Sequence, residues 1–185
     1  MIITLSGRPG SGKTTVGTML AQHFGYETYD IGIMRREIAR RRGLTLAEYN
    51  TLGETDPSTD TDVDNFQREL GETKDNFIIQ GRLGFHFIPH SVKIFLDCSR
   101  DASVARIWKD LQANPETRNE GKFKTPEELR TNIEARDASD VARYAKYYNG
   151  LNHLEPANYD LWLDTSTITP EETFQAILAF LDKKS

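Results

Sequence analysis

The chain has 185 residues, of which 37% are hydrophobic and 28% charged, and this composition suits one domain with a core of ordinary size. Its net charge of −5 argues against a general nucleic-acid or anionic-membrane surface, so residues that bind phosphates must be concentrated locally. The single cysteine, Cys98, excludes an intramolecular disulfide, and no apolar run approaches the roughly 20 residues that span a bilayer. We expect a cytoplasmic protein without a signal peptide.

Short apolar runs alternate with longer amphipathic stretches along the chain. The runs predict strands at residues 2–5, 28–30, 77–80, 92–97 and 159–163. The stretches predict helices near residues 13–24, 33–42, 45–54, 61–73, 101–112, 126–148 and 170–183. Capping boxes mark three of the helix starts, at Thr45, Thr125 and Thr169. This alternation predicts an α/β fold, a three-layer α/β/α sandwich with a five-stranded parallel sheet, which binds its ligand at the carboxyl ends of the strands.

The first predicted strand runs into residues 7–14, which match the pattern G-x-x-x-x-G-K-[ST] of a P-loop. Its glycines let the backbone curl so that successive N–H groups point into one hollow at a helix N-terminus, where an anion binds. Lys13 reaches terminal phosphates as a point charge, and the Thr14 hydroxyl can hold Mg²⁺. The sequence therefore predicts a nucleoside triphosphate site formed by Gly7, Arg8, Pro9, Gly10, Ser11, Gly12, Lys13, Thr14 and Thr15.

Two segments do not fit a compact sheet. Residues 45–73 form a helical insertion that the polar run 54–64 interrupts, and residues 112–124 are polar with almost no core-forming side chains. Such segments are typical of mobile flaps that close over a substrate, the alternative being solvated loops. We expect a single domain with a core of residues 1–44, 75–111 and 150–185, an insertion at about 45–74 and a lid at about 112–149.

One face of the predicted helix 126–148 carries charged and aromatic side chains. Arg136, Asp140, Arg143, Tyr144 and Tyr147 follow the spacing i, i+4, i+7, i+8, i+11, which places them on one side of a helix. The guanidinium group donates in a planar fork, so two arginines here suit phosphoryl oxygens, with Asp140 orienting one of them. The alternative is an ion-pair ladder on an exposed helix.

Further arginines are candidates for an acceptor anion. Arg82 follows Gly81 at the carboxyl end of the predicted strand 77–80, and Arg35 and Arg36 begin another helix beyond a strand. Because these two are neighbours on a helix, we expect only one of them to point into the site.

Polar side chains of the insertion and of the strand ends are also candidates. Asp60, Asp64 and Gln67 share a helical face and can read a base edge by hydrogen bonding, although plain solubility is the alternative reading. A carboxylate at a strand end commonly helps to position Mg²⁺ beside a P-loop. Gln80 is neutral, which leaves Asp97 and Asp30 as alternatives.

These residues together resemble the cytidylate kinases of the nucleoside monophosphate kinase group, including the short type common in archaea. The resemblance runs nearly end to end, through the P-loop, G-x-x-x-R at residues 32–36, Q-G-R-L-G at 80–84, I-P at 88–89, V-K-I-F-L-D at 92–97, R-D-x-S-D-x-x-R-Y at 136–144 and L-D-T-S-T at 163–167. The P-loop is shared by many kinases, whereas the G-R-L-G segment at 81–84 and the helix motif at 136–144 are together much more specific.

The resemblance implies phosphoryl transfer from ATP to CMP or dCMP with Mg²⁺. We expect the protein to be a monomer without nucleic-acid or membrane partners. The resemblance also implies that Lys13 and Thr14 serve the ATP phosphates and the metal, and that Arg136, Arg143 and Asp140 close over the reacting centre. It assigns CMP to Arg36, Arg82, Gly81, Asp60, Asp64 and Gln67.

Two residues depart from the family pattern. Gln80 replaces the acidic residue usual before the G-R pair, and Asp30-Ile31 stands where related sequences often carry serine and a small residue. These departures keep two alternatives open: a P-loop kinase of another nucleoside monophosphate or small metabolite, and a weakly active nucleotide-binding switch.

Overall fold

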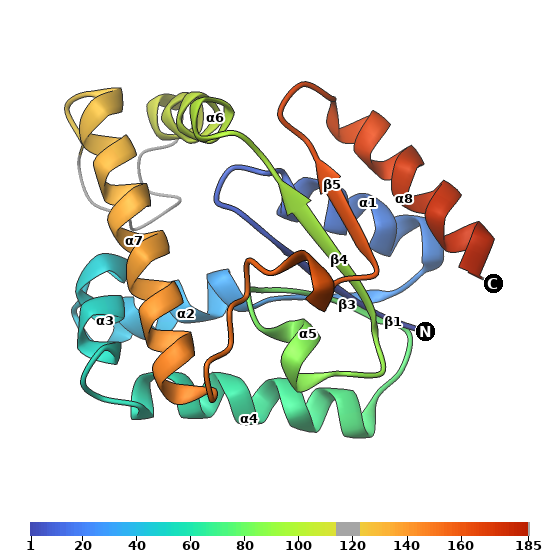
Figure 1. Cartoon of the computed structure of the whole chain (residues 1–185), viewed down its shortest axis with the longest axis horizontal. Helices are drawn as coiled ribbons and strands as arrows, with labels where there is room; N and C mark the ends of the chain where they lie inside the picture. Colours follow the sequence, from blue (N-terminus) through green and yellow to red (C-terminus); the bar gives the residue numbers. More distant parts are fainter. Residues whose placement is uncertain (114–122, 185) are drawn as a thin grey trace.

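Five parallel strands form one sheet in the order β2-β3-β1-β4-β5, as the computed structural model describes for residues 1–113 and 123–184 (Figure 1). The strands are β1 (Ile2–Gly7), β2 (Glu27–Asp30), β3 (Phe77–Gln80), β4 (Val92–Asp97) and β5 (Leu161–Asp164). β1 is buried along its whole length because it lies at the centre of the sheet with helices over both faces. The predicted α/β fold is confirmed.

The sequence pattern located nearly all the helices. They are α1 (Lys13–Phe24), α2 (Ile31–Arg41), α3 (Leu46–Gly53), α4 (Ser58–Thr73), α5 (Gly84–Phe87), α6 (Arg100–Ala113), α7 (Pro126–Tyr147) and α8 (Pro170–Lys184), with a 3₁₀ turn at Pro156–Asn158. Two expectations were wrong. The four-residue helix α5 was missed because so short an element shows no periodicity, and the polar run 54–64 is not a long interruption, since α4 begins at Ser58.

Alternate strand residues build a separate core on each face of the sheet. Ile3 and Leu5 of β1 pack with α1 and α8, where Leu20 and Ile177 are fully buried. Side chains of the opposite parity, including Phe77 of β3, pack in a second cluster with residues of α4 and α5. The two-residue period of a strand produces this division, so each face is covered by its own helices (Figure 1).

Side-chain caps fix the starts of the predicted helices. Thr45 and Thr169 each accept a hydrogen bond from the third helical residue, whose glutamate in turn accepts from the backbone N–H of the threonine. Thr125 accepts from the Glu128 N–H, but the Glu128 side chain accepts from Lys124 instead, so only half of that box forms. None of the helices in the described ranges combines the length and apolar character that a bilayer-spanning helix needs.

Candidate active site

The P-loop joins the carboxyl end of β1 to α1, and its glycines are required by close backbone approach. A Cβ atom on Gly7 would lie 2.2 Å from the carbonyl oxygen of Leu96 in β4, and one on Gly10 would lie 2.9 Å from the Ser103 carbonyl oxygen. Gly10 also has a φ of +73°, which L side chains rarely adopt. The loop thus packs closely against β4 and α6, and this packing fixes its curved backbone conformation.

Lys13 begins α1 with its ammonium group turned back over the loop. Its Nζ donates to the carbonyl oxygens of Gly7 at 2.9 Å and Arg8 at 2.8 Å. Burial, and after it the charge of Arg82, lower the pKa of Lys13 to about 7, although Asp30 works to raise it. The cations around the loop therefore outweigh the nearby carboxylate, and a bound anion would stabilise the charged lysine.

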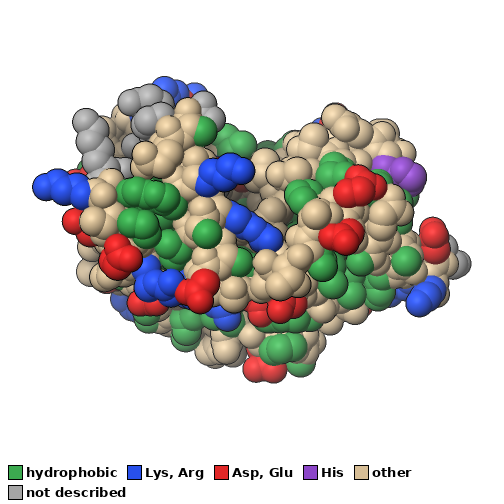
Figure 2. Space-filling view, turned by 90° about the horizontal axis from the view of Figure 1, so that it is seen from above, with side chains coloured by type: hydrophobic (Ala, Val, Ile, Leu, Met, Phe, Trp, Pro, Cys, Tyr) green, Lys and Arg blue, Asp and Glu red, His purple; other side chains and the backbone are tan. Residues whose placement is uncertain are grey.

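One cavity of about 710 Å³ contains the P-loop together with most of the predicted site residues. Figure 2 shows one face of the molecule hollowed near its middle, with Lys and Arg side chains gathered beside the hollow. Of the predicted residues, the cavity wall includes Lys13, Thr14, Arg36, Asp60, Asp64, Gln67, Gly81, Arg82, Arg136, Asp140 and Arg143. Arg8 alone of the predicted ATP-binding residues lies on a neighbouring smaller hollow instead.

The two neighbouring arginines of α2 have different surroundings, although both line the cavity. Arg35 contacts the Asp60 carboxylate and donates to Asn50 at 3.2 Å. The guanidinium group of Arg36 lies beside Gly32, and among the described residues no carboxylate is within 4.0 Å of it. Arg36 is therefore the arginine of the pair that is available to an anionic ligand.

The face of α7 that carries Asp140, Arg143 and Tyr144 is buried in the molecule. It is therefore not an exposed ion-pair ladder. Asp140 lies between two arginines, with its Oδ2 2.5 Å from Arg82 and its Oδ1 2.6 Å from Arg143. Arg143 is only 2% exposed and also lies 3.3 Å from Asp60 of α4. Tyr144 is buried beside it, whereas Tyr147 donates to the carbonyl oxygen of Glu54, away from the cavity.

Electrostatics keep this cluster charged despite its burial. Burial works to raise the pKa of Asp140, but Arg82 and Arg143 outweigh it and hold that pKa below the usual range. Burial works to lower the pKa of Arg143, but Tyr144 and Asp140 outweigh it and raise that pKa. The guanidinium groups are thus held in place as permanent cations at the cavity wall.

At the end of the cavity lined by α4, the polar side chains of Asp60, Asp64 and Gln67 are buried. Gln67 is 2% exposed, and its Nε2 donates to the Val63 carbonyl oxygen at 3.4 Å while its Oε1 has no partner among the described residues. Asp64 accepts from the Tyr148 hydroxyl at 2.5 Å, and burial raises the pKa of Asp64 to about 6. The amide oxygen of Gln67 and the carboxylate of Asp64 can therefore accept hydrogen bonds from a ligand.

Replacing Asp64 by asparagine is expected to change how stability depends on pH. The raised pKa means that the folded state holds this proton more tightly than the unfolded chain, so the stabilisation is present below about pH 4 and is lost as the pH rises to about 6. The unfolding free energy of D64N, relative to the natural chain, should therefore increase between pH 4.5 and 7.5 in urea titrations. D62N, on the exposed side of the same helix, is the control; an equal change in both variants would contradict the expectation.

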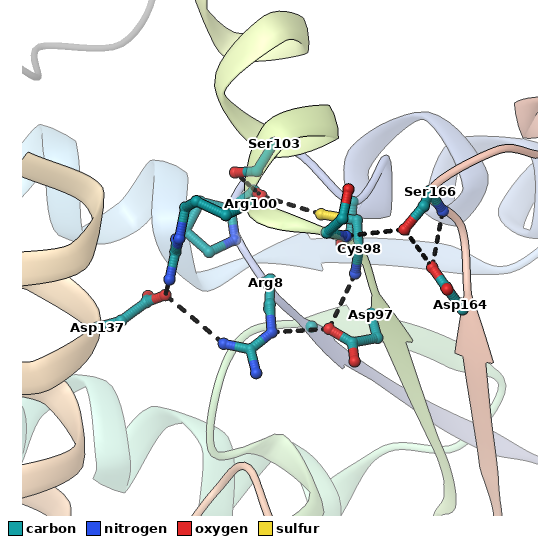
Figure 3. Close-up of polar contacts among 12 residues, drawn as sticks. Arg8, Asp97, Cys98, Arg100, Ser103, Asp137, Asp164 and Ser166 are labelled. Carbon is teal, nitrogen blue, oxygen red and sulfur yellow. Dashed lines mark hydrogen bonds and ion pairs between the residues drawn. The ribbon is translucent and has the colours of Figure 1, made fainter. Parts of the chain in front are cut away.

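Asp137 is a functional candidate that the sequence reasoning missed. Its carboxylate lies 2.8 Å from Arg100 of α6, 3.3 Å from Arg82 and 3.8 Å from Arg8 of the P-loop. In Figure 3, Arg8 lies between Asp137 and Asp97, whose Oδ1 accepts from Arg8 Nε at 2.7 Å. Asp137 stands three residues before Asp140 on the same helical face, so the helical period was a signal for it.

Replacing Asp137 by asparagine is expected to lower the free energy of unfolding by about 1–3 kcal/mol, because partly buried arginines from separate elements lose their shared counter-charge. Asp101, whose ion pair with Arg130 is exposed, is the matched control, and D101N should stay within about 0.5 kcal/mol of the natural chain. Chemical unfolding of both variants measures the difference. Equal stability of the two variants would show that the Asp137 cluster is not structural.

Some residues of the cavity wall, unlike Asp137, had no signal in the sequence. Arg106 of α6 donates to the Gly10 carbonyl oxygen at 3.2 Å and to the Thr165 carbonyl oxygen at 2.6 Å. Ile168, in the connection from β5 to α8, and Pro170, the first residue of α8, add apolar side chains to the cavity wall. These side chains belong to elements far apart in the chain, and only the fold brings them to one cavity.

Residues 2–167 match the cytidylate kinase-like family. The cytidylate kinase of Halobacterium salinarum is 35% identical over 98% of this chain and 90% of that protein. The cytidylate kinase of Methanopyrus kandleri is 36% identical over 98% of this chain and 93% of that protein.

Among solved structures, the shikimate kinase of Bacteroides thetaiotaomicron matches with a TM-score of 0.66, covering 98% of each chain at 19% identity. At such identity the match supports only the fold, that of a P-loop kinase. The sequence matches are closer and cover nearly the whole length of this chain. The chain therefore belongs to the cytidylate kinase-like family.

Proposed function

We propose that this protein transfers the γ-phosphoryl group of ATP directly to CMP, and to dCMP, and that it does so as a monomer. The observation that carries the proposal is the shared cavity, in which a P-loop faces two acceptor-side arginines, Arg36 and Arg82. Donor and acceptor phosphates bound at these two places would meet within one cavity. Family membership supports the choice of acceptor.

The P-loop is the proposed ATP end of the cavity. Its backbone N–H groups and the N-terminus of α1 bind the phosphates, and Lys13 donates to them once a ligand displaces its contacts with Gly7 and Arg8. The Thr14 hydroxyl lies 3.1 Å from a carboxylate oxygen of Asp30, and such oxygen donors suit Mg²⁺. When bound, Mg²⁺ would neutralise charge that develops on the transferring group.

The arginines are proposed to act on the acceptor and on the reacting phosphoryl group. Arg36 and Arg82 hold the CMP phosphate, and Arg136 and Arg143 donate to oxygens of the group in transfer. Phosphoryl transfer passes through a loose, charge-dispersed transition state, so positioning and electrostatic stabilisation supply most of the catalysis. Asp140 supports this arrangement because it holds Arg82 and Arg143 in fixed positions.

The α4 side of the cavity is proposed to select the base. The Asp64 carboxylate is suited to accept from the exocyclic amino group of cytosine, whereas uracil presents a carbonyl oxygen at that position. Gln67 and Asp60 complete this polar wall. We therefore expect CMP and dCMP to be better acceptors than UMP.

The proposal is tested by coupled measurement of ADP release from ATP and Mg²⁺ with CMP, dCMP, UMP, AMP and GMP in turn. We expect strong turnover with CMP and dCMP and at least about tenfold lower kcat/KM with UMP, the scale of one discriminating hydrogen bond. Preferred turnover of another acceptor would make the protein a kinase of that molecule. Tight ATP binding without turnover of any acceptor would indicate a nucleotide-binding switch.

A further inference from the structure

Polar side chains end several strands at the nucleotide edge of the sheet, and three of them were candidates from the sequence or stand at the family's usual carboxylate position. These three are Asp30 of β2, Gln80 of β3 and Asp97 of β4. Mg²⁺ is a hard cation that prefers oxygen ligands and is commonly bound through one or two carboxylates besides phosphate groups. A carboxylate can bind the same Mg²⁺ ion as ATP only if it is directed at the Thr14 hydroxyl of the P-loop. The directions of these three side chains therefore decide which of them can bind the metal.

Asp97 is directed away from that hydroxyl. Its Oδ1 accepts from Arg8 Nε at 2.7 Å and from the backbone N–H of Cys98 at 2.9 Å (Figure 3). It lines the smaller hollow beside Cys98 and Arg100, whereas Thr14 lines the main cavity. Asp97 therefore pairs with Arg8 of the P-loop and does not contact the Thr14 hydroxyl.

Gln80 is neutral, and its amide is packed between β2 and α1. Its Nε2 donates to the Thr28 hydroxyl of β2 at 3.0 Å. The amide occupies the space above Gly17 of α1, where an added Cβ would lie 2.5 Å from Nε2. The end of β3 thus contributes packing at this point and no negative charge.

Asp30 is the register partner of Gln80 on the neighbouring strand, so the carboxylate is shifted sideways by one strand at the same level of the sheet. Its two oxygens have separate partners. Oδ1 accepts from the Ile33 N–H at 2.9 Å and caps α2, while Oδ2 accepts from the Thr14 hydroxyl at 3.1 Å. The cap fixes the side chain, and the second oxygen is held against the hydroxyl of the P-loop.

We propose that Asp30 provides the carboxylate that binds Mg²⁺ beside Thr14, directly or through a water molecule. The metal-binding carboxylate is then supplied by the end of β2 instead of the end of β3. The neutral Gln80 then costs the enzyme no metal affinity. This inference rests on the proposed function only in its use of a nucleotide–metal complex, and it is independent of the acceptor.

The test is the affinity of Mn²⁺, used as the probe for Mg²⁺, for the full-length protein saturated with ADP, measured from the electron paramagnetic resonance signal of free Mn²⁺. Asp30→Asn is expected to weaken Mn²⁺ binding at least about tenfold, the usual effect of losing an outer-shell metal partner. Asparagine also caps helices well, so α2 stays intact, and Asp30→Ser is a second variant that keeps a cap acceptor. ADP affinity measured in EDTA should stay unchanged or increase, because a negative charge near the phosphates is removed.

Asp97→Asn is the matched control, since it changes another strand-end carboxylate of the same sheet but keeps an acceptor for Arg8. Its Mn²⁺ affinity should stay within about twofold of the natural chain, well below the tenfold loss expected at Asp30. The proposal is overturned if Asp30→Asn leaves Mn²⁺ affinity within twofold, or if it weakens ADP equally with and without the metal. Because no acceptor is present, failure of CMP turnover would leave this result unaffected.

Discussion

Arg143→Ala is expected to lower kcat by roughly 10³-fold or more, the scale of an arginine that stabilises phosphoryl transfer from within the same chain. Arg143 is held by Asp140 and Asp60 at the cavity wall, so its guanidinium group is preorganised before ligands bind. The effect should fall on kcat and kcat/KM alike, because the interaction is made with charge that develops only in the transition state. Steady-state ADP release at saturating ATP and CMP measures it.

Loss of this buried arginine also takes one of two arginine partners from Asp140 and from Asp60, which costs at most about 3–5 kcal/mol of stability because Arg82 and Arg35 remain. Turnover must therefore be expressed per folded molecule, with the folded fraction taken from circular dichroism at the assay temperature. Arg143→Lys keeps the positive charge but not the planar fork, and its kcat should still fall by roughly 10². Arg130→Ala, on the exposed side of the same helix, should leave kcat unchanged. Unchanged turnover in folded Arg143→Ala would remove α7 from the mechanism.

Lys13→Met is expected to lower kcat by roughly 10²–10³, the usual effect of removing one preorganised donor from a site of developing charge. Methionine keeps most of the length and apolar volume of lysine but carries no charge, so the P-loop should retain its shape. The reason for the loss is electrostatic: the ammonium group is held by the Gly7 and Arg8 carbonyl oxygens over the loop that is proposed to bind the ATP phosphates.

Single-turnover assays together with ATP titrations separate the two roles of Lys13. A fall in ATP affinity with an unchanged rate of transfer would mean that the lysine binds ground state and transition state equally, contrary to the expectation. Lys183→Met, near the exposed end of α8, controls for the loss of one surface charge. Thermal unfolding of both variants shows whether the substitution alters the fold.

Local sequence patterns were sufficient for the strands, most helices and the P-loop. A strand, a helix cap and a glycine-rich loop each depend on residues within a few positions of one another, so their physical causes are visible in the chain itself. The helix α5 was missed because four residues carry no period, and the beginning of α4 was misplaced because its polar first turn resembles a loop.

The charged face of α7 was half recognised from its spacing. Arg136, Asp140 and Arg143 were identified, but Asp137 was not, although it lies on the same side of the helix. Its importance comes from Arg8, Arg82 and Arg100, which three other elements bring to it. No pattern within one helix contains that information.

The sequence by itself determined that this protein has a parallel α/β fold with a P-loop and a set of arginines fit for phosphoryl groups, because period, turn chemistry and motif spacing are local. Only the tertiary structure decided which members of that set act together. It separated Arg36 from Arg35, and it directed Asp30 at Thr14 while Asp97 turned to Arg8. Side-chain direction at a strand end is set by packing between elements distant in the chain, which residue order alone does not specify.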